Sequence, residues 1–147
     1  TYSLHVILRF NLERQLIEGT LDPKDLPDAW NQAMHDLLGV EVPNDAQGVL
    51  QDVHWSNGGI GYFPTYALGN LLAVQLFERA CADLPDLMRD IEGGRLGGLR
   101  EWLNTHVHAH GAKFTPAALI QRVTGEALRP EPYLRYIEAK YRELYGL

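Results

Sequence analysis

The stretch GVLQDVHWSNGGIGYFPTYALG, residues 48–69, decides how the rest of the chain is arranged. Its charged, imidazole and aromatic residues follow neither a helical nor a strand period, which predicts a shaped loop that serves a site. Three glycines stand close together near its middle: Gly58, Gly59 and Gly61. Glycine permits backbone angles that other residues resist, so we expect the loop to fold back and bring His54 and Tyr62 to one pocket.

Outside this loop, apolar residues recur at the three- and four-residue spacing of helices, and glycine or proline closes each run. The expected helices cover about residues 1–18, from Pro23 or Pro27 to 38, 64–82, a short segment ending at Gly93, 99–110, 116–124 and 130–145. No clear strand, internal repeat or low-complexity tract is present. The sequence therefore predicts an all-α orthogonal assembly of about six helices with a long Gly-rich functional loop, folded as a single domain over 1–147.

Two of the expected helices carry a regular apolar stripe, which predicts their buried sides. In the first helix the stripe is Leu4, Leu8, Leu12 and Leu16, with Ile7 beside it. In the last helix it is Leu134, Ile137, Tyr141 and Leu144. The first helix would keep uncovered apolar surface if its usual neighbours lay upstream.

Composition narrows the class of protein. The 147 residues carry a formal charge of −6, which argues against nucleic acid as a partner. No apolar run is long enough to cross a bilayer, and no signal peptide is recognisable. Cys81 is the only cysteine, which suits a reducing cytoplasm, and its apolar helical neighbours predict a buried structural thiol. Because the chain opens on TYSLHVILRF without Met, we expect that the true N-terminus is missing.

The loop also resembles a known family. The residues Gly48, Gln51, Asp52, His54 and Trp55 match the Gly-x-x-Gln-Asp-x-His-Trp motif of the thermostable (Taq-type) zinc metallocarboxypeptidases. The following residues, Gly61-Tyr-Phe-Pro-Thr-Tyr with Leu68-Gly69, match the next segment of that family. The resemblance extends over nearly the whole chain but covers only the C-terminal part of such an enzyme. It implies a cytoplasmic, typically homodimeric zinc enzyme that acts on peptides and releases single C-terminal amino acids with broad specificity.

Zinc peptidases commonly bind the metal through His-Glu-x-x-His, and this motif does not occur in the chain. The resemblance implies that the zinc ligands and the general base lie upstream, so we expect no cofactor in this chain and no activity from it alone. His106 and His110 have a spacing that can chelate zinc, but no third ligand accompanies them, which favours core or interface histidines. His5 and His35 carry no motif.

The resemblance implies catalytic roles for His54 and Tyr62, whose side chains would contact the substrate or the transition state. The alternative is a structural role for both residues, in which His54 holds the loop in place through hydrogen bonds and the ring of Tyr62 packs against its neighbours. Arg9 and Asp52 are the candidates for substrate binding, since a bidentate arginine suits a peptide's free carboxylate. The alternatives are that Arg9 pairs with an acid, and that Asp52 orients a histidine or caps the loop.

The remaining loop residues have expected supporting roles. Gln51 and Trp55 would support the loop, while Phe63 and Tyr66 would be core aromatics beneath it. A second hypothesis for the whole chain is a non-catalytic helical module that binds peptides or proteins through this loop. A third hypothesis is that the loop pocket binds a small molecule, although no residue of the sequence points to a particular ligand.

Overall fold

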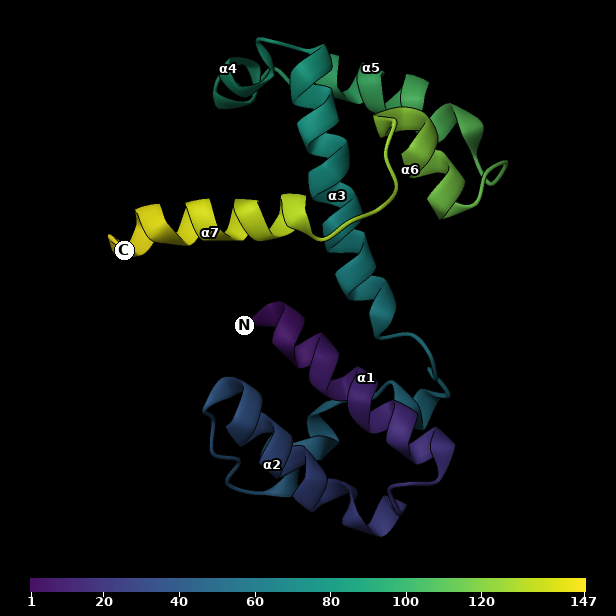
Figure 1. The fold of residues 1–147 in the computed structure, drawn as a ribbon, viewed down its shortest axis with the longest axis vertical. Helices are drawn as coiled ribbons and strands as arrows, with labels where there is room; N and C mark the ends of the chain where they lie inside the picture. Colours follow the sequence, from purple (N-terminus) through teal and green to yellow (C-terminus); the bar gives the residue numbers. More distant parts are fainter. The chain divides into compact units, whose positions relative to one another are not determined.

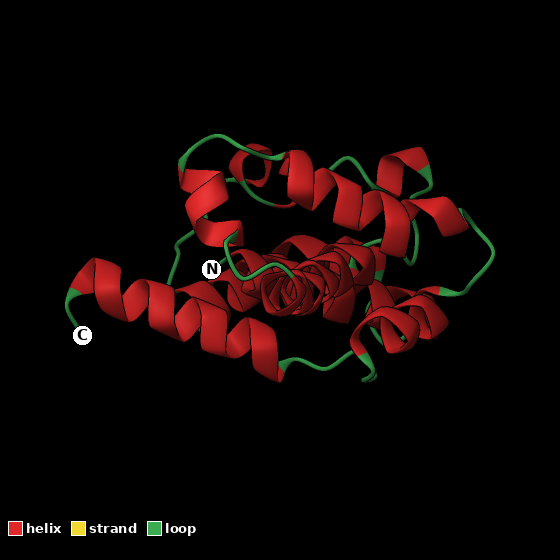
Figure 2. Cartoon of the chain, turned by 90° about the horizontal axis from the view of Figure 1, so that it is seen from above, coloured by secondary structure: helices red, strands yellow, loops and turns green.

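The computed structural model describes all residues, 1–147, and it contains helices and no strands (Figures 1 and 2). This confirms the all-α fold predicted from the sequence. The α-helices are α1 (Tyr2–Glu18), α2 (Leu26–Leu38), α3 (Pro64–Asp83), α4 (Leu87–Glu92), α5 (Gly97–His106), α6 (Pro116–Thr124) and α7 (Glu131–Tyr145). None of them is long and apolar enough to span a membrane.

Most helix ends lie where local sequence signals place them. α1 and α2 end on Gly19 and Gly39, both in the left-handed conformation. The N-terminus of α6 is capped by Thr115, whose Oγ1 accepts a hydrogen bond from the backbone N–H of Ala118 at 3.3 Å. Such caps satisfy backbone groups that a helix end leaves without partners, so they fix where the helix stops.

The chain divides into two compact units, Thr1–Leu68 and Gly69–Leu147, with α3 beginning in the first and continuing into the second. In the first unit α1 contacts α2, and the core is made by Leu8, Leu12, Trp30 and Val49. In the second unit the core is made by Ala80, Leu87 and Trp102. That residues 1–147 fold as a single domain stays a prediction.

α1 does not bury the whole stripe that its sequence predicts. Leu8 and Leu12 are buried, but Leu4 and Ile7 are 36% and 44% exposed, so the prediction was wrong for these two. The apolar residues Phe10 and Ile17 are exposed as well. Charged and imidazole residues of α1, described below, take the side facing the loop, and no element of this chain covers Leu4 and Ile7.

α7 also differs from its expected packing. Leu134, Tyr141 and Leu144 are exposed, and Ile137 is only half-buried. The regular apolar stripe predicted a helix correctly, but it did not show that this chain would supply a surface to cover it. An exposed ion pair, Arg135 to Glu78 at 3.1 Å, ties α7 to α3.

The expected helix over 99–110 ends early. α5 stops at His106, and residues His108–His110 form a separate 3-10 turn, so His106 and His110 do not share one helical face. His106 is exposed and packs on Trp102, with 4.9 Å between ring centroids, so of the two predicted roles, core or interface, the core position was wrong for it and the interface stays a prediction. His110 instead packs on Phe114, with 5.2 Å between ring centroids.

Cys81 is half-buried rather than buried. Burial, and then the nearby carboxylate of Glu78, raise the pKa of its thiol. Both effects disfavour the thiolate, which is the reactive form of cysteine. This thiol is therefore poorly suited to act as a nucleophile.

Candidate functional site

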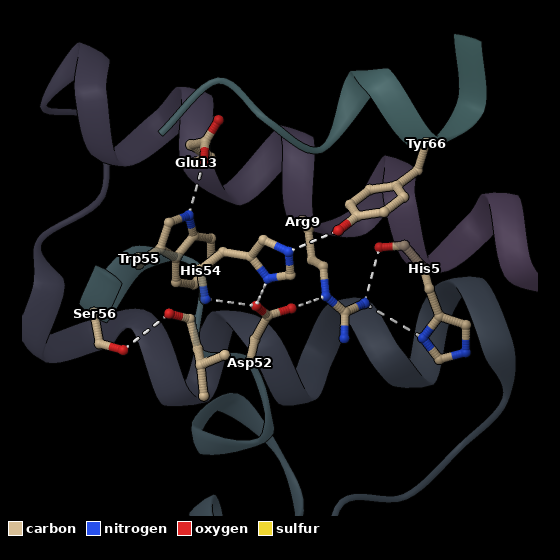
Figure 3. A network of polar contacts seen from close by, with 9 residues as sticks. His5, Arg9, Glu13, Asp52, His54, Trp55, Ser56 and Tyr66 are labelled. Atoms are coloured by element: carbon tan, nitrogen blue, oxygen red, sulfur yellow. Dashed lines mark hydrogen bonds and ion pairs between the residues drawn. The ribbon is translucent and has the colours of Figure 1, made fainter. Parts of the chain in front are cut away.

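The site lies in the first unit, between α1 and the loop that precedes α3. Three polar residues of α1, each four apart, belong to the site: Arg9 and Glu13 hydrogen-bond residues of the loop, and His5 contacts Arg9 (Figure 3). Residues four apart lie on one side of a helix, one turn above the other. α1 thus presents a ladder of hydrogen-bonding groups to the loop.

Arg9 is the central residue of this ladder. Its Nε donates to Asp52 Oδ2, and its Nη1 donates to the backbone oxygen of His5 at 3.0 Å. The guanidinium also lies over the ring of Trp30, 4.8 Å from the centroid. The side chain of Arg9 is 18% exposed and that of Asp52 is 6% exposed, so this is a largely buried ion pair.

Asp52 joins Arg9 to His54. Its Oδ1 accepts from the Nδ1 of His54 and, at 3.1 Å, from the backbone N–H of the same residue. Burial by itself would raise the pKa of Asp52, but the hydrogen bonds from Arg9 and His54 outweigh it and hold the pKa below its ordinary value. Asp52 is therefore an ionised acceptor, which places a proton on Nδ1 of His54.

The other nitrogen of His54 faces Tyr66. Its Nε2 lies 2.9 Å from the Tyr66 hydroxyl, so the four residues form one continuous polar chain from Arg9 to Tyr66 (Figure 3). Burial raises the pKa of Tyr66, which keeps its hydroxyl protonated. Tyr66 is half-buried and belongs to this chain, so the prediction of a plain core aromatic was wrong for it. Phe63 is buried beneath the loop, as predicted.

Aromatic rings surround the imidazole of His54. The ring of Tyr62 stacks on it, with 5.9 Å between centroids and an interplanar angle of 27°. Phe63 lies 4.9 Å away, centroid to centroid. Tyr62 is 50% exposed, so its hydroxyl can meet a ligand while its ring limits how the imidazole can turn.

Side chains of this site, Tyr62 not among them, line a pocket of about 450 Å³. The lining residues are Tyr2, His5, Val6, Arg9, Asp52, His54, Phe63 and Tyr66. A volume of a few hundred Å³ with a few convergent polar groups is typical of sites for small ligands or peptide ends. In the pocket, burial first and then the charge of Arg9 lower the pKa of His5, so this imidazole stays neutral at neutral pH.

The loop glycines have the geometric role that the sequence indicated. Gly61 has φ 74°, which a residue with a side chain rarely adopts. Gly59 packs so tightly that an added Cβ would lie 3.1 Å from the backbone oxygen of His54. The loop also contains two short 3-10 turns, Val49–Gln51 and Trp55–Asn57, which the sequence did not reveal.

The supporting residues of the loop make contacts on both of its sides. Gln51 donates from Nε2 to the backbone oxygen of Ala46, within the segment before the site. Trp55 donates from Nε1 to Glu13 at 2.9 Å and meets the ring of Trp30 edge-on. These contacts are those of residues that shape the loop.

The candidates His54, Arg9 and Asp52 line the pocket together. Tyr62 stacks on His54 but is not among the lining residues, so the expected shared pocket for His54 and Tyr62 is not found, and Gln51 and Trp55 also lie outside the lining. Sequence reasoning missed Glu13 and gave His5 no role. Their four-residue spacing with Arg9 puts the three on one side of α1, but the helix carries other polar residues at other spacings, so the sequence does not single them out.

The residues of the site do not fit a metal ion. No group of three or more histidine, cysteine, aspartate or glutamate side chains in the chain is placed to hold one. A tightly bound zinc ion needs three or four such ligands. The arrangement can instead orient an imidazole, a phenol and a neutral histidine around a pocket.

The chain is similar to known proteins over nearly its whole length. A family model described as carboxypeptidase Taq (M32) metallopeptidase matches residues 1–141. Thermostable carboxypeptidase 1 of Thermus thermophilus is 47% identical over 99% of this chain, which spans 29% of that relative. Carboxypeptidase 1 of Bacillus subtilis is 41% identical over 100% of this chain, again spanning 29% of the relative.

Solved structures give the same result. The crystal structure of M32 carboxypeptidase from Deinococcus radiodurans R1 is similar, with a TM-score of 0.95 and 46% identity over 99% of this chain and 30% of that one. Trypanosoma cruzi metallocarboxypeptidase 1 has a TM-score of 0.90 and 42% identity over 96% of this chain and 30% of that one. The chain therefore belongs to the carboxypeptidase Taq (M32) family of metallopeptidases and corresponds to a C-terminal part of its members.

Proposed function

We propose that this chain forms the part of a metallocarboxypeptidase that holds and polarises the end of a peptide, while another part of the enzyme holds the metal. The observation that carries the proposal is the polar chain Arg9–Asp52–His54–Tyr66 in the wall of the 450 Å³ pocket. Membership of a metallopeptidase family supports peptides as the substrates. The bound metal would supply the Lewis acid and the activated water for hydrolysis.

Proton positions decide what His54 can do. With Nδ1–H bonded to Asp52, a neutral His54 accepts the Tyr66 O–H at Nε2. In a doubly protonated imidazole, with Asp52 as the counter-charge, Nε2–H would be a donor, and a substrate oxygen would have to take the place of the Tyr66 hydroxyl in front of it. Such a donor stabilises the negative oxygen that develops when a peptide bond is attacked. We propose that Tyr62, whose ring stacks on His54, adds a second hydroxyl donor; the stacking and its 50% exposure support this role.

Arg9 and Asp52 act on the substrate through His54 in this proposal. Arg9 already donates to Asp52 and to His5, and its guanidinium lies against Trp30. A peptide carboxylate would have to compete with these partners for the same cation. The geometry favours the alternative in which Arg9 pairs with an acid, and Asp52 orients a histidine.

The remaining properties of the complete enzyme follow from the family resemblance. We extend the proposal to zinc as the metal, a homodimer as the assembly, the cytoplasm as the location and broad specificity for the released amino acid. Each rests on what members of such a family share, and none is needed for the geometry described above.

The proposal is tested with His54→Gln in a complete enzyme that contains this sequence. We expect kcat/KM for a peptide substrate to fall about a hundredfold with the metal content unchanged, since removing one transition-state donor typically has this effect. His35→Gln is the matched control, because His35 is an exposed histidine paired with Glu41, outside the pocket lining. Equal activity of both variants would refute the proposed site and favour the non-catalytic peptide-binding module.

A further inference from the structure

Glu13 is a buried carboxylate that the proposed reaction does not use. Its side chain is on α1, one turn after Arg9, and the residue is only 4% exposed. Burying a carboxylate is costly unless hydrogen-bond donors surround it. The partners of Glu13 therefore indicate what it is for.

Both partners belong to the functional loop. Oε2 accepts the indole N–H of Trp55 at 2.9 Å (Figure 3). Oε1 accepts the backbone N–H of Gly61 at 2.8 Å. These two residues are the ends of the segment 55–61, and they lie 42 and 48 positions from Glu13 in the sequence. One carboxylate thus ties both ends of this segment to α1.

The residues just outside this segment are His54 and Tyr62. His54 immediately precedes Trp55, and Tyr62 immediately follows Gly61. The backbone oxygen of His54 accepts from the N–H of Gly59 at 2.7 Å, so the segment closes on itself. With its ends fixed, the stacked placement of the two rings is fixed as well.

We infer that Glu13 is a positioning residue, which sets the His54–Tyr62 pair by clamping the segment 55–61 against α1. This inference rests on the proposed function of that pair. Glutamate is the residue that fits, because both of its oxygens must accept a hydrogen bond. Glutamine offers one acceptor and one NH₂ group, and the NH₂ group would face an N–H that also donates.

The test uses Glu13→Gln in a complete enzyme that contains this sequence. Hydrogen–deuterium exchange of a peptide covering 55–63 should speed up, and kcat/KM should fall roughly tenfold with the metal content unchanged, as for a small displacement of reacting groups. Glu13→Asp keeps the charge and both acceptors, and it should recover part of the loss.

Asp83→Asn is the matched control. Asp83 also accepts an indole N–H, that of Trp102 at 2.9 Å, but in the second unit. If the effect of Glu13→Gln were only general loss of stability, this control would reproduce it. We expect the control to leave exchange over 55–63 and kcat/KM unchanged.

A double-mutant cycle with Trp55→Phe tests the clamp chemistry directly. Phenylalanine has no N–H, so in that background the amide introduced by Glu13→Gln no longer meets a second donor. The added loss from Glu13→Gln should then shrink to about threefold or less, as expected for groups that interact directly.

Each outcome decides one point. Faster exchange over 55–63 without a fall in kcat/KM would overturn the positioning role while leaving the proposed function intact. Unchanged exchange would overturn the clamp itself. If the His54→Gln variant kept full activity, that result would instead contradict the proposed function, independently of the results for Glu13.

Discussion

Replacing Asp52 with Asn removes the charge at the centre of the polar chain while keeping the shape of the side chain. The carboxylate accepts from Arg9 and from two groups of His54, and its side chain is 6% exposed. Asn keeps one oxygen acceptor, and its NH₂ group faces a donor. The guanidinium of Arg9 then lacks its negative partner, although the Arg9 side chain is only 18% exposed to water.

The cost follows from this geometry. Removing one partner of a fully buried ion pair costs about 3–5 kcal/mol in free energy of unfolding. Water reaches part of Arg9, so we expect about 2–3 kcal/mol for Asp52→Asn. With a urea dependence of about 2 kcal/mol per molar, the unfolding midpoint should fall by about 1–1.5 M.

The assay is urea unfolding of the chain, followed by tryptophan fluorescence. The matched control is Asp90→Asn, because Asp90 pairs with Arg95 at 2.9 Å on the surface, with side chains 40% and 58% exposed. Exposed pairs contribute under about 1 kcal/mol. If Asp52→Asn destabilises no more than this control, the reasoning about a buried network is wrong.

The same substitution has a signature in pH. The pKa of Asp52 is lower in the folded chain than its ordinary 3.8, so its stabilisation is fully present above about pH 4 and is lost as the pH falls through the lower value. Asp52→Asn should therefore flatten the acid limb of a stability-versus-pH curve. An unchanged acid limb would show that Asp52 does not titrate as described.

Three further results are expected. Tyr66→Phe removes the hydroxyl that faces Nε2 of His54, so in a complete enzyme the pH dependence of kcat/KM should shift while the metal content stays the same. An unshifted pH profile would show that the Tyr66 hydroxyl does not influence His54. Gly61→Ala places a side chain at φ 74° and should lower the unfolding free energy by about 1 kcal/mol in a urea titration, whereas no loss would mean that the loop relaxes freely. Equilibrium dialysis should find no stoichiometric zinc on the chain, and replacing His106 and His110 by Ala should change nothing; one tightly bound zinc per chain would contradict this.

The sequence predicted helix positions well because helix ends are local. Gly19, Gly39 and Thr115 stop or start a helix through contacts within a few residues, which a single sequence displays. The break after His106 was missed because the apolar spacing continues across it, although the backbone becomes a 3-10 turn. The spacing of apolar residues does not show where the backbone hydrogen bonds of a helix end.

Residues of the loop were easier to find than their partners. His54 and Tyr62 stand in an unusual run of glycines and aromatics, so the sequence singles them out. Glu13 is 42 positions away from Trp55, and a lone carboxylate on a helix usually faces water, so nothing local distinguished it. Long-range pairs of this kind need the fold before they can be recognised.

α1 buries Leu8 and Leu12, as a surface helix normally does, but it also encloses Arg9 and Glu13 and leaves several apolar residues exposed. Hydrophobicity alone therefore mispredicts which substitutions this helix tolerates. Lysine or glutamate at Ile7, Phe10 or Ile17 would improve the solubility of this chain at little cost to folding, whereas leucine at Arg9 or Glu13 would leave hydrogen-bond partners unpaired and would destabilise the fold. Engineering of this chain for solubility should start from the exposed apolar positions.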